Sequence, residues 1–184
     1  MADELIDIVD KQGNYTGKTC LKSEAHQFGY FHATVHIWIY TSNKKILLQK
    51  RGLNKKVFPG LWDISVAGHI GAGESIENAA IREIEEEIGF SIPKNKLTKI
   101  GTRKHQVKHN NGIIDNEFHH VFITELTIPV NQLKIQEDEV DAIDLFDLDI
   151  LLETEKHENV LLPQFHDYYA NVHTAITDKL FTNQ

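Results

Sequence analysis

The chain has 184 residues, a net charge of −8 and 41% hydrophobic residues, values typical of one domain that buries a hydrophobic core without disulfide bonds. The negative charge disfavours a nucleic acid polymer as the main partner. We expect a cytoplasmic protein with no membrane partner, because the first residues are acidic, no hydrophobic run approaches the roughly 18 residues of a membrane span, and Cys20 is the single cysteine.

The first part of the chain alternates extended segments with turns. Residues rich in β-branched and aromatic side chains flank a Ser-Asn-Lys turn at 42–44, which indicates a hairpin. An earlier hairpin is indicated around the Asp-Lys-Gln-Gly-Asn turn at 10–14. The expected elements are two hairpins, 5–9 with 15–20 and 33–40 with 45–50, a short helix at 21–27, and a short strand at 63–67.

A glycine-rich turn then leads into an acidic helix. Ser75 is a plausible N-cap, hydrophobic residues recur at helical spacing from Ile76 to Ile88, and Gly89 is the expected stop, so we predict a helix over about 75–88. Helical spacing places three carboxylates on one patch: Glu83, Glu86 and Glu87. Such oxygen ligands suit Mg²⁺ or Mn²⁺, although an acidic run alone is usually a solvated helix face.

Further strands and helices are expected after this helix. A polar loop at 109–112 joins two predicted strands, and an acidic run that contains Glu139 precedes a third. Hydrophobic residues at helical spacing indicate a helix near the C-terminal end. The expected elements are strands at 99–107, 117–124 and 140–145 and helices at 147–156 and 163–180; no linker divides the chain.

The stretch from Gly68 to Phe90 resembles, position by position, the box of the Nudix hydrolases. The residues at the constrained positions are Gly68, Glu74, Arg82, Glu83, Ile84, Glu86, Glu87, Gly89 and Phe90. The resemblance implies a single α/β Nudix domain over 1–184, an α/β/α sandwich around a mixed β-sheet. Its parts would be an N-terminal hairpin extension at 1–32, the box at 68–90 and a C-terminal helix at 163–181.

The family resemblance also implies Mg²⁺- or Mn²⁺-dependent hydrolysis of a diphosphate linkage in a nucleoside diphosphate joined to another group. The metal ligands would be Gly68, Glu83, Glu86 and Glu87, and Arg82 would orient Glu83 or Glu86. Glu139 is the first candidate for the general base, ahead of Glu86. The candidates for binding substrate are Arg51, Lys55, Lys56 and His69, and for each of the three bases an ordinary solvated side chain is the alternative.

The chain is also similar, from about Leu5 to Leu152, to type I isopentenyl diphosphate isomerases, through the run at 51–62 and the pentad at 65–69. The isomerase pattern implies a second metal site for Zn²⁺ or Mn²⁺ at His26, His32, His69, Asp115 and Glu117, with His26 and His32 one residue closer together than in that pattern. His36, His119 and His120 are expected to be ordinary strand residues.

Hydrolysis is favoured over isomerisation by two departures from the isomerase pattern. The isomerases use a cysteine for proton exchange where this chain has Ala67, whose methyl group cannot exchange a proton. The box carboxylates, which the isomerases mostly lack, are all present, and this also argues against a nucleotide sensor without catalysis. No proline lies between Pro93 and Pro129, unlike the ADP-ribose branch. The candidate partners are a small diphosphate substrate and, as the alternative to a monomer, a second copy of the chain in a homodimer.

Overall fold

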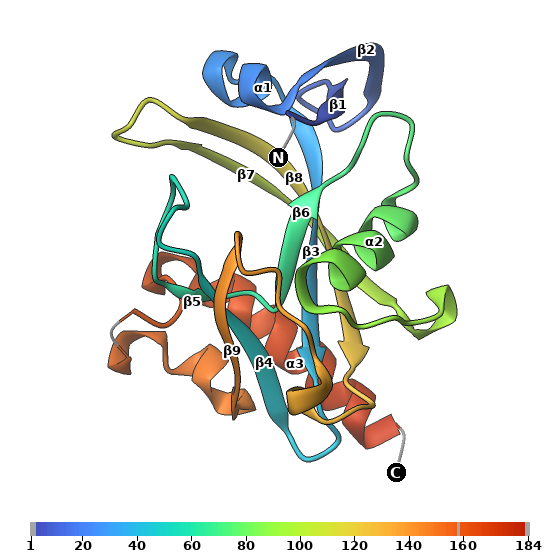
Figure 1. The fold of residues 1–184 in the computed structure, drawn as a ribbon, viewed down its shortest axis with the longest axis vertical. Coiled ribbons are helices and arrows are strands. Elements are labelled where there is room, and N and C mark those ends of the chain that lie inside the picture. The colour runs from blue at the N-terminus through green and yellow to red at the C-terminus, as the bar shows by residue number, and fades with distance from the viewer. Residues whose placement is uncertain (1–2, 158, 183–184) are drawn as a thin grey trace.

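A mixed β-sheet of nine strands lies at the centre of the computed structural model, which describes residues 3–157 and 159–182 (Figure 1). The strands are β1 Leu5–Val9, β2 Tyr15–Leu21, β3 His32–Tyr40, β4 Lys45–Arg51, β5 Trp62–Asp63, β6 Val66–His69, β7 Thr98–Lys108, β8 Ile114–Glu125 and β9 Val140–Asp147. The α-helices are α1 Lys22–Phe28, α2 Ile76–Ile88 and α3 His166–Thr182, and short 3₁₀ helices span Lys94–Lys96, Val130–Gln132, Leu148–Leu152, Thr154–Lys156 and Pro163–Phe165.

Strand β3 organises the sheet. It pairs in parallel with β8 along its whole length, from His32 opposite Glu117 to Tyr40 opposite Glu125. It also pairs antiparallel with β6 and, for two residue pairs next to the turn, with β4. The predicted hairpin of β3 and β4 therefore exists but opens soon after its turn, and farther along β4 pairs with β5 at Gln49 and Lys50 instead.

The prediction of one strand over 63–67 is wrong, because this segment is divided between two partners. β5 pairs with β4, whereas β6 pairs with β3. Ser65 lies between them and is buried: its Oγ accepts a hydrogen bond from Ile39 N at 2.8 Å and donates one to Leu47 O. The hydroxyl thus satisfies backbone groups where β3 and β4 separate.

The helix predicted over 147–156 is also wrong as a single element, since this segment forms two short 3₁₀ helices, Leu148–Leu152 and Thr154–Lys156. The other predicted elements are confirmed, with ends that shift by a few residues. The C-terminal helix, for example, begins with a 3₁₀ turn at Pro163–Phe165 before α3.

Two hydrophobic cores lie on opposite faces of the sheet. Val35, Ile37 and Ile39 pack in the core that includes residues of α2, whereas Trp38 and Tyr40 pack in the core that includes residues of α3. Alternate residues of a strand point to opposite faces, so His32, Thr34 and His36 share the face of Trp38. The α/β/α arrangement expected from the sequence is confirmed (Figure 1).

Candidate functional site

The box turn and helix α2 form as the sequence predicts. Ser75 Oγ accepts a hydrogen bond from Asn78 N at 3.3 Å, which caps the N-terminus of α2. Gly89 ends the helix in the left-handed conformation at φ 63°. The helix presents Ile84 and Ile88 to the core, and Glu83 and Glu87, which precede them by one residue, are buried beside them.

Glu83 lies directly against the backbone of Gly68. A Cβ atom at position 68 would stand 2.0 Å from Glu83 Cδ, so only glycine allows this approach. Residue Glu83 is 8% exposed and residue Glu87 is 4% exposed. Two carboxylates are therefore held in a largely buried position beside the backbone of β6, and carboxylate oxygens are ligands that hard cations prefer.

Burial makes both carboxylates difficult to ionise without a cation. It raises the pKa of Glu83 to about 7, although the Arg82 guanidinium opposes this shift. Burial, together with the charge of Glu83, raises the pKa of Glu87 to about 8, and the hydrogen bond from Gln49 opposes it. A divalent cation would remove the repulsion, so the pair fits a metal.

Arg82 contacts three of the acidic residues of the box. Its guanidinium donates to Glu74, to Glu83 Oε1 at 2.9 Å and to Glu86 Oε2 at 2.9 Å, as well as to the backbone oxygen of His69 at 2.9 Å. Glu86 is more exposed than Glu83, with 54% of its side chain accessible. Arg82 thus contacts both residues that it was predicted to orient.

Glu139 lies near the box and is paired with a base. Lys55 Nζ is 2.5 Å from Glu139 Oε2, and both charges influence the pKa of Glu87, which places them in its surroundings. Arg51 is engaged elsewhere: its Nε donates to Val57 O at 3.1 Å, and its Nη1 lies 3.8 Å from Asp63 Oδ2. Lys56 is exposed on the same loop.

Gln49 contacts a box carboxylate and was not among the residues predicted from the sequence. It is 7% exposed and its Nε2 donates to Glu87 Oε2 at 2.8 Å. Strand alternation could have identified it, because Gln49 lies two residues after Leu47 on β4 and its side chain therefore points into the same core as that of Leu47. A buried amide at such a position needs a polar partner.

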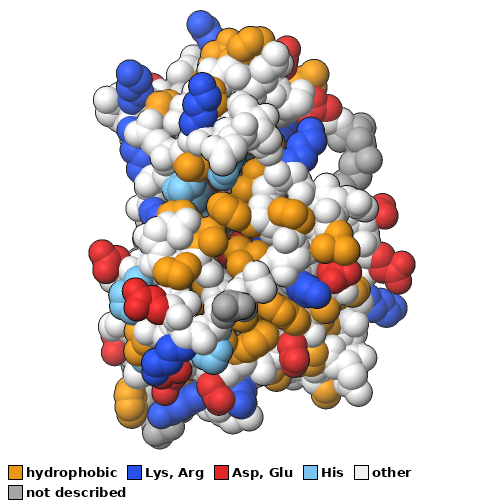
Figure 2. All heavy atoms as spheres, turned by 90° about the vertical axis from the view of Figure 1, so that its left-hand side faces the viewer, with side chains coloured by type: hydrophobic (Ala, Val, Ile, Leu, Met, Phe, Trp, Pro, Cys, Tyr) orange, Lys and Arg blue, Asp and Glu red, His pale blue; other side chains and the backbone are white. Residues whose placement is uncertain are grey.

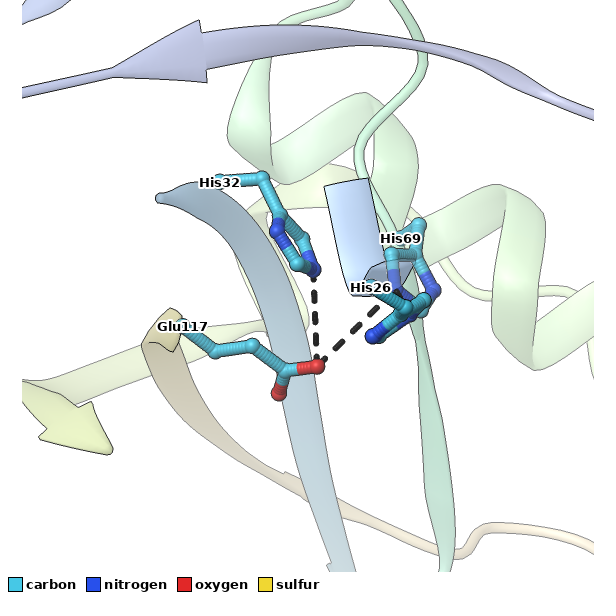
Figure 3. Close-up of side chains that lie close together, drawn as sticks. All are labelled: His26, His32, His69 and Glu117. Atoms are coloured by element: carbon cyan, nitrogen blue, oxygen red, sulfur yellow. Dashed lines mark hydrogen bonds and ion pairs between the residues drawn. The ribbon is translucent and has the colours of Figure 1, made fainter. Parts of the chain in front are cut away.

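A second cluster lies on the opposite face of β6. His69 pairs with Thr34 and Glu117 pairs with His32, so their side chains share the face of the sheet turned away from α2. His26, on α1, completes the group (Figure 3). Each of the four residues offers a ligand atom within 4.8 Å of the others, a compact set of three imidazoles and one carboxylate.

The imidazoles of this cluster are oriented by other groups. His32 Nδ1 is 2.9 Å from Tyr30 O, and since a carbonyl only accepts, the proton is on Nδ1 and the Nε2 lone pair is free. That buried Nε2 has no hydrogen-bond partner among the described residues. Asp115 lies outside the group of four: its Oδ1 is 2.9 Å from His26 Nδ1, and its Oδ2 is 2.7 Å from His109 Nε2.

Protonation states in the cluster suit a transition metal. Burial lowers the pKa of His69 well below its ordinary value. Burial opposes ionisation of Glu117, yet the hydrogen bond from His119 brings the pKa of Glu117 well below the ordinary value. A neutral imidazole, as at His69, beside a carboxylate anion is the state in which such groups bind Zn²⁺ or Mn²⁺. On the side shown in Figure 2, histidine side chains lie beside hydrophobic ones.

A family model and two known proteins match a large part of this chain. Residues 30–167 match the model of the NUDIX domain. The chain is 39% identical over 147 residues to Nudix hydrolase 3 of Arabidopsis thaliana, covering 78% of this chain but only 19% of that protein. It is 38% identical over 121 residues to isopentenyl-diphosphate Delta-isomerase 2 of Photorhabdus laumondii, covering 66% of each chain.

A solved structure, that of DR0079 from Deinococcus radiodurans, shares the fold with a TM-score of 0.68 at 17% identity, over 91% of this chain and 98% of that one. Within the part of the chain that the structure describes, no helix is long and hydrophobic enough to cross a membrane.

Proposed function

Because the chain belongs to the Nudix hydrolases, a family of pyrophosphohydrolases, we propose that it cleaves the diphosphate linkage of a nucleoside diphosphate joined to another group, using Mg²⁺ or Mn²⁺. The observation that carries this proposal is the buried pair Glu83 and Glu87 against Gly68. Two carboxylates with raised pKa values on one helix face are unfavourable without a cation, and a diphosphate brings further ligands for one.

The metal would be held by Glu83, Glu87 and the backbone oxygen of Gly68, with Glu86 as a further ligand. A divalent ion bound there supplies charge neutralisation for the diphosphate and lowers the pKa of a bound water. Arg82 keeps Glu83 and Glu86 in place through its hydrogen bonds, and Gln49 does the same for Glu87. Arg82 is thus a positioning residue whose loss would disorder several carboxylates at once.

Glu139 is the proposed general base, ahead of Glu86. Lys55 binds Oε2 of this carboxylate, so Glu139 would accept a proton from water at Oε1 or after Lys55 releases Oε2. The released ammonium group would then be free to bind a phosphate oxygen, the role predicted for Lys55. Lys56, exposed on the same loop, is a further candidate for the phosphate, whereas Arg51 would first have to leave Val57 and Asp63.

The second cluster is proposed as a separate Mn²⁺ or Zn²⁺ site held by His26, His32, His69 and Glu117. The free Nε2 of His32 supports it, since a buried nitrogen without a partner costs stability until it binds something. This arrangement favours His69 as a metal ligand rather than a contact of the diphosphate at the box. Asp115 stays a candidate ligand, and it holds His26 in this structure.

Isomerisation of a carbon–carbon double bond is the second candidate, supported by the histidine cluster and the similarity to an isomerase. Ala67 argues against it. It lies on β6 opposite His36 and offers no group that could exchange a proton with a substrate carbon. Incorporation of deuterium from heavy water into isopentenyl diphosphate, followed by NMR, would detect this activity.

A screen of a diphosphate library with Mg²⁺ and Mn²⁺, read as phosphate release after phosphatase coupling, tests the hydrolase. We expect at least one nucleoside diphosphate derivative to be cleaved by the wild type and left intact by Glu87→Gln, with Glu85→Gln as the matched control on the exposed face of α2. Circular dichroism verifies that each variant is folded. Equal cleavage by wild type and Glu87→Gln would refute the proposal.

A further inference from the structure

His119 is a buried residue on β8, and its contacts divide the two oxygens of Glu117 between different roles. His119 Nε2 lies 2.8 Å from Glu117 Oε2. The other oxygen, Oε1, lies 3.5 Å from His32 Nε2 and 4.0 Å from His69 Nε2. One oxygen is thus held from outside the cluster, and the other faces the imidazoles that would bind a metal (Figure 3).

The proton of the His119–Glu117 contact belongs to the imidazole. His119 Nδ1 is buried without a hydrogen-bond partner among the described residues. If the proton were on Nδ1, a buried donor would lack an acceptor, and this would lower the stability of the fold. The tautomer with the proton on Nε2 avoids this loss, because Nε2 has the Glu117 oxygen as its acceptor. His119 Nε2 then donates to the Glu117 carboxylate. A hydrogen bond of this kind fixes a metal-binding carboxylate in one rotamer.

The ring of His119 is connected to helix α3 through His36. It stacks on the ring of His36, with the two centroids 3.9 Å apart and an interplanar angle of 27°. His36 Nδ1 lies 3.0 Å from the Tyr168 hydroxyl, and that hydroxyl oxygen accepts from Trp38 Nε1 at 2.8 Å. Since an indole only donates, the Tyr168 proton is not directed to Trp38 and is available to His36 Nδ1.

We infer that His119 is a positioning residue of the second metal site: it donates to Glu117 and keeps the opposite oxygen turned toward His32 and His69. Tyr168 supports this geometry from α3 through His36. The inference rests on the proposed second site, and it gives a role to a histidine that the sequence alone assigns to an ordinary strand. It also links metal affinity to the C-terminal helix.

The test measures Mn²⁺ binding by isothermal titration calorimetry and the visible spectrum of bound Co²⁺, with the full chain in a Glu83→Gln/Glu87→Gln background that silences the box. His119→Phe retains the ring stack and the volume but removes the donor, and it should weaken Mn²⁺ binding about 10- to 100-fold and alter the Co²⁺ spectrum. His119→Gln, whose amide can donate, should restore much of the affinity. His120→Phe, on the opposite face of β8, should leave affinity unchanged.

The outcomes distinguish failure of the proposed second metal site from failure of the role inferred for His119. If the box-silenced chain binds neither ion, or if His32→Ala does not reduce binding, the second site is refuted and this inference with it. If the chain binds Mn²⁺ and loses it with His32→Ala, yet His119→Phe binds as the parent does, only the role of His119 is refuted. Should His119→Phe fail to fold, Tyr168→Phe provides the same test with a smaller expected loss of affinity.

Discussion

Glu87→Gln should make the metal-free protein more stable while it removes metal-dependent activity. The residue is 4% exposed, and the Gln49 amide that donates to it can equally donate to the carbonyl oxygen of glutamine. The pKa of Glu87 is raised from 4.5 to about 8, so the folded state binds more protons than the unfolded chain between these pH values. The stability of the wild type therefore falls as the pH rises through this window.

The size of the effect follows from the pKa. At about 1.4 kcal/mol per pKa unit, the preference of the unfolded chain for an ionised Glu87 lowers the stability of the folded protein by roughly 2 kcal/mol at pH 6 and roughly 4 kcal/mol at pH 8. Glutamine carries no charge at either pH, so the variant should be more stable than the wild type by about these amounts. Saturating Mn²⁺ should reverse the order, because binding stabilises only the protein that retains the ligand.

The assay is urea unfolding at pH 6 and pH 8, with EDTA and then with Mn²⁺. Glu85→Gln is the control, since this glutamate is exposed on the same helix and should change the free energy of unfolding little at either pH. A Glu87→Gln variant as stable as the wild type at pH 8, or a gain in stability that does not grow with pH, would show that the Glu87 carboxylate is not held in the state described.

Two other substitutions test the packing around the sites. Gly68→Ala introduces a Cβ that would stand 2.0 Å from Glu83 Cδ, so Glu83 must move. We expect at least a tenfold loss of Mn²⁺ affinity at the box. Gly101→Ala is the control, because nothing lies within 4 Å of a Cβ at that position. Unchanged affinity in Gly68→Ala would contradict the close approach. Tyr168→Phe leaves Trp38 Nε1 and His36 Nδ1 without their partner, and thermal unfolding should show a loss of about 1–3 kcal/mol, against little change for exposed Tyr15→Phe; equal losses would refute this hydrogen-bond assignment.

The box was predictable from sequence because its geometry is local. Helical spacing alone brings Glu83 and Glu87 to one face, and Ser75 and Gly89 mark the two ends of the helix through their own backbone preferences. What spacing could not supply is the burial of the two carboxylates. That depends on how closely α2 packs on β6, which the absence of a side chain at Gly68 permits.

The second cluster depends on strand register and could not be derived from spacing. His32 meets Glu117 because β3 and β8 are paired in parallel, and His69 joins them because β6 is paired on the other side of β3. The resemblance to isomerases supplied these residues, and the structure brings His26 into the group despite its shorter spacing from His32. Asp115, predicted as a ligand from the same resemblance, contacts His26.

The division of residues 63–67 had the same non-local origin. Every residue from Asp63 to Ala67 is compatible with one strand, and only the separation of β3 from β4 assigns its two ends to different partners. Gln49 was missed for a related reason: its role appears only when β4 and α2 are placed together.

Cleavage of the best substrate from the library in ¹⁸O-labelled water, with the products weighed by mass spectrometry, tests most directly whether the box carboxylates support attack of water on a diphosphate. The account predicts one ¹⁸O atom in a phosphate-containing product of the wild type and no product from Glu83→Gln/Glu87→Gln in the same time. Products without ¹⁸O, or undiminished cleavage by the double variant, would contradict it.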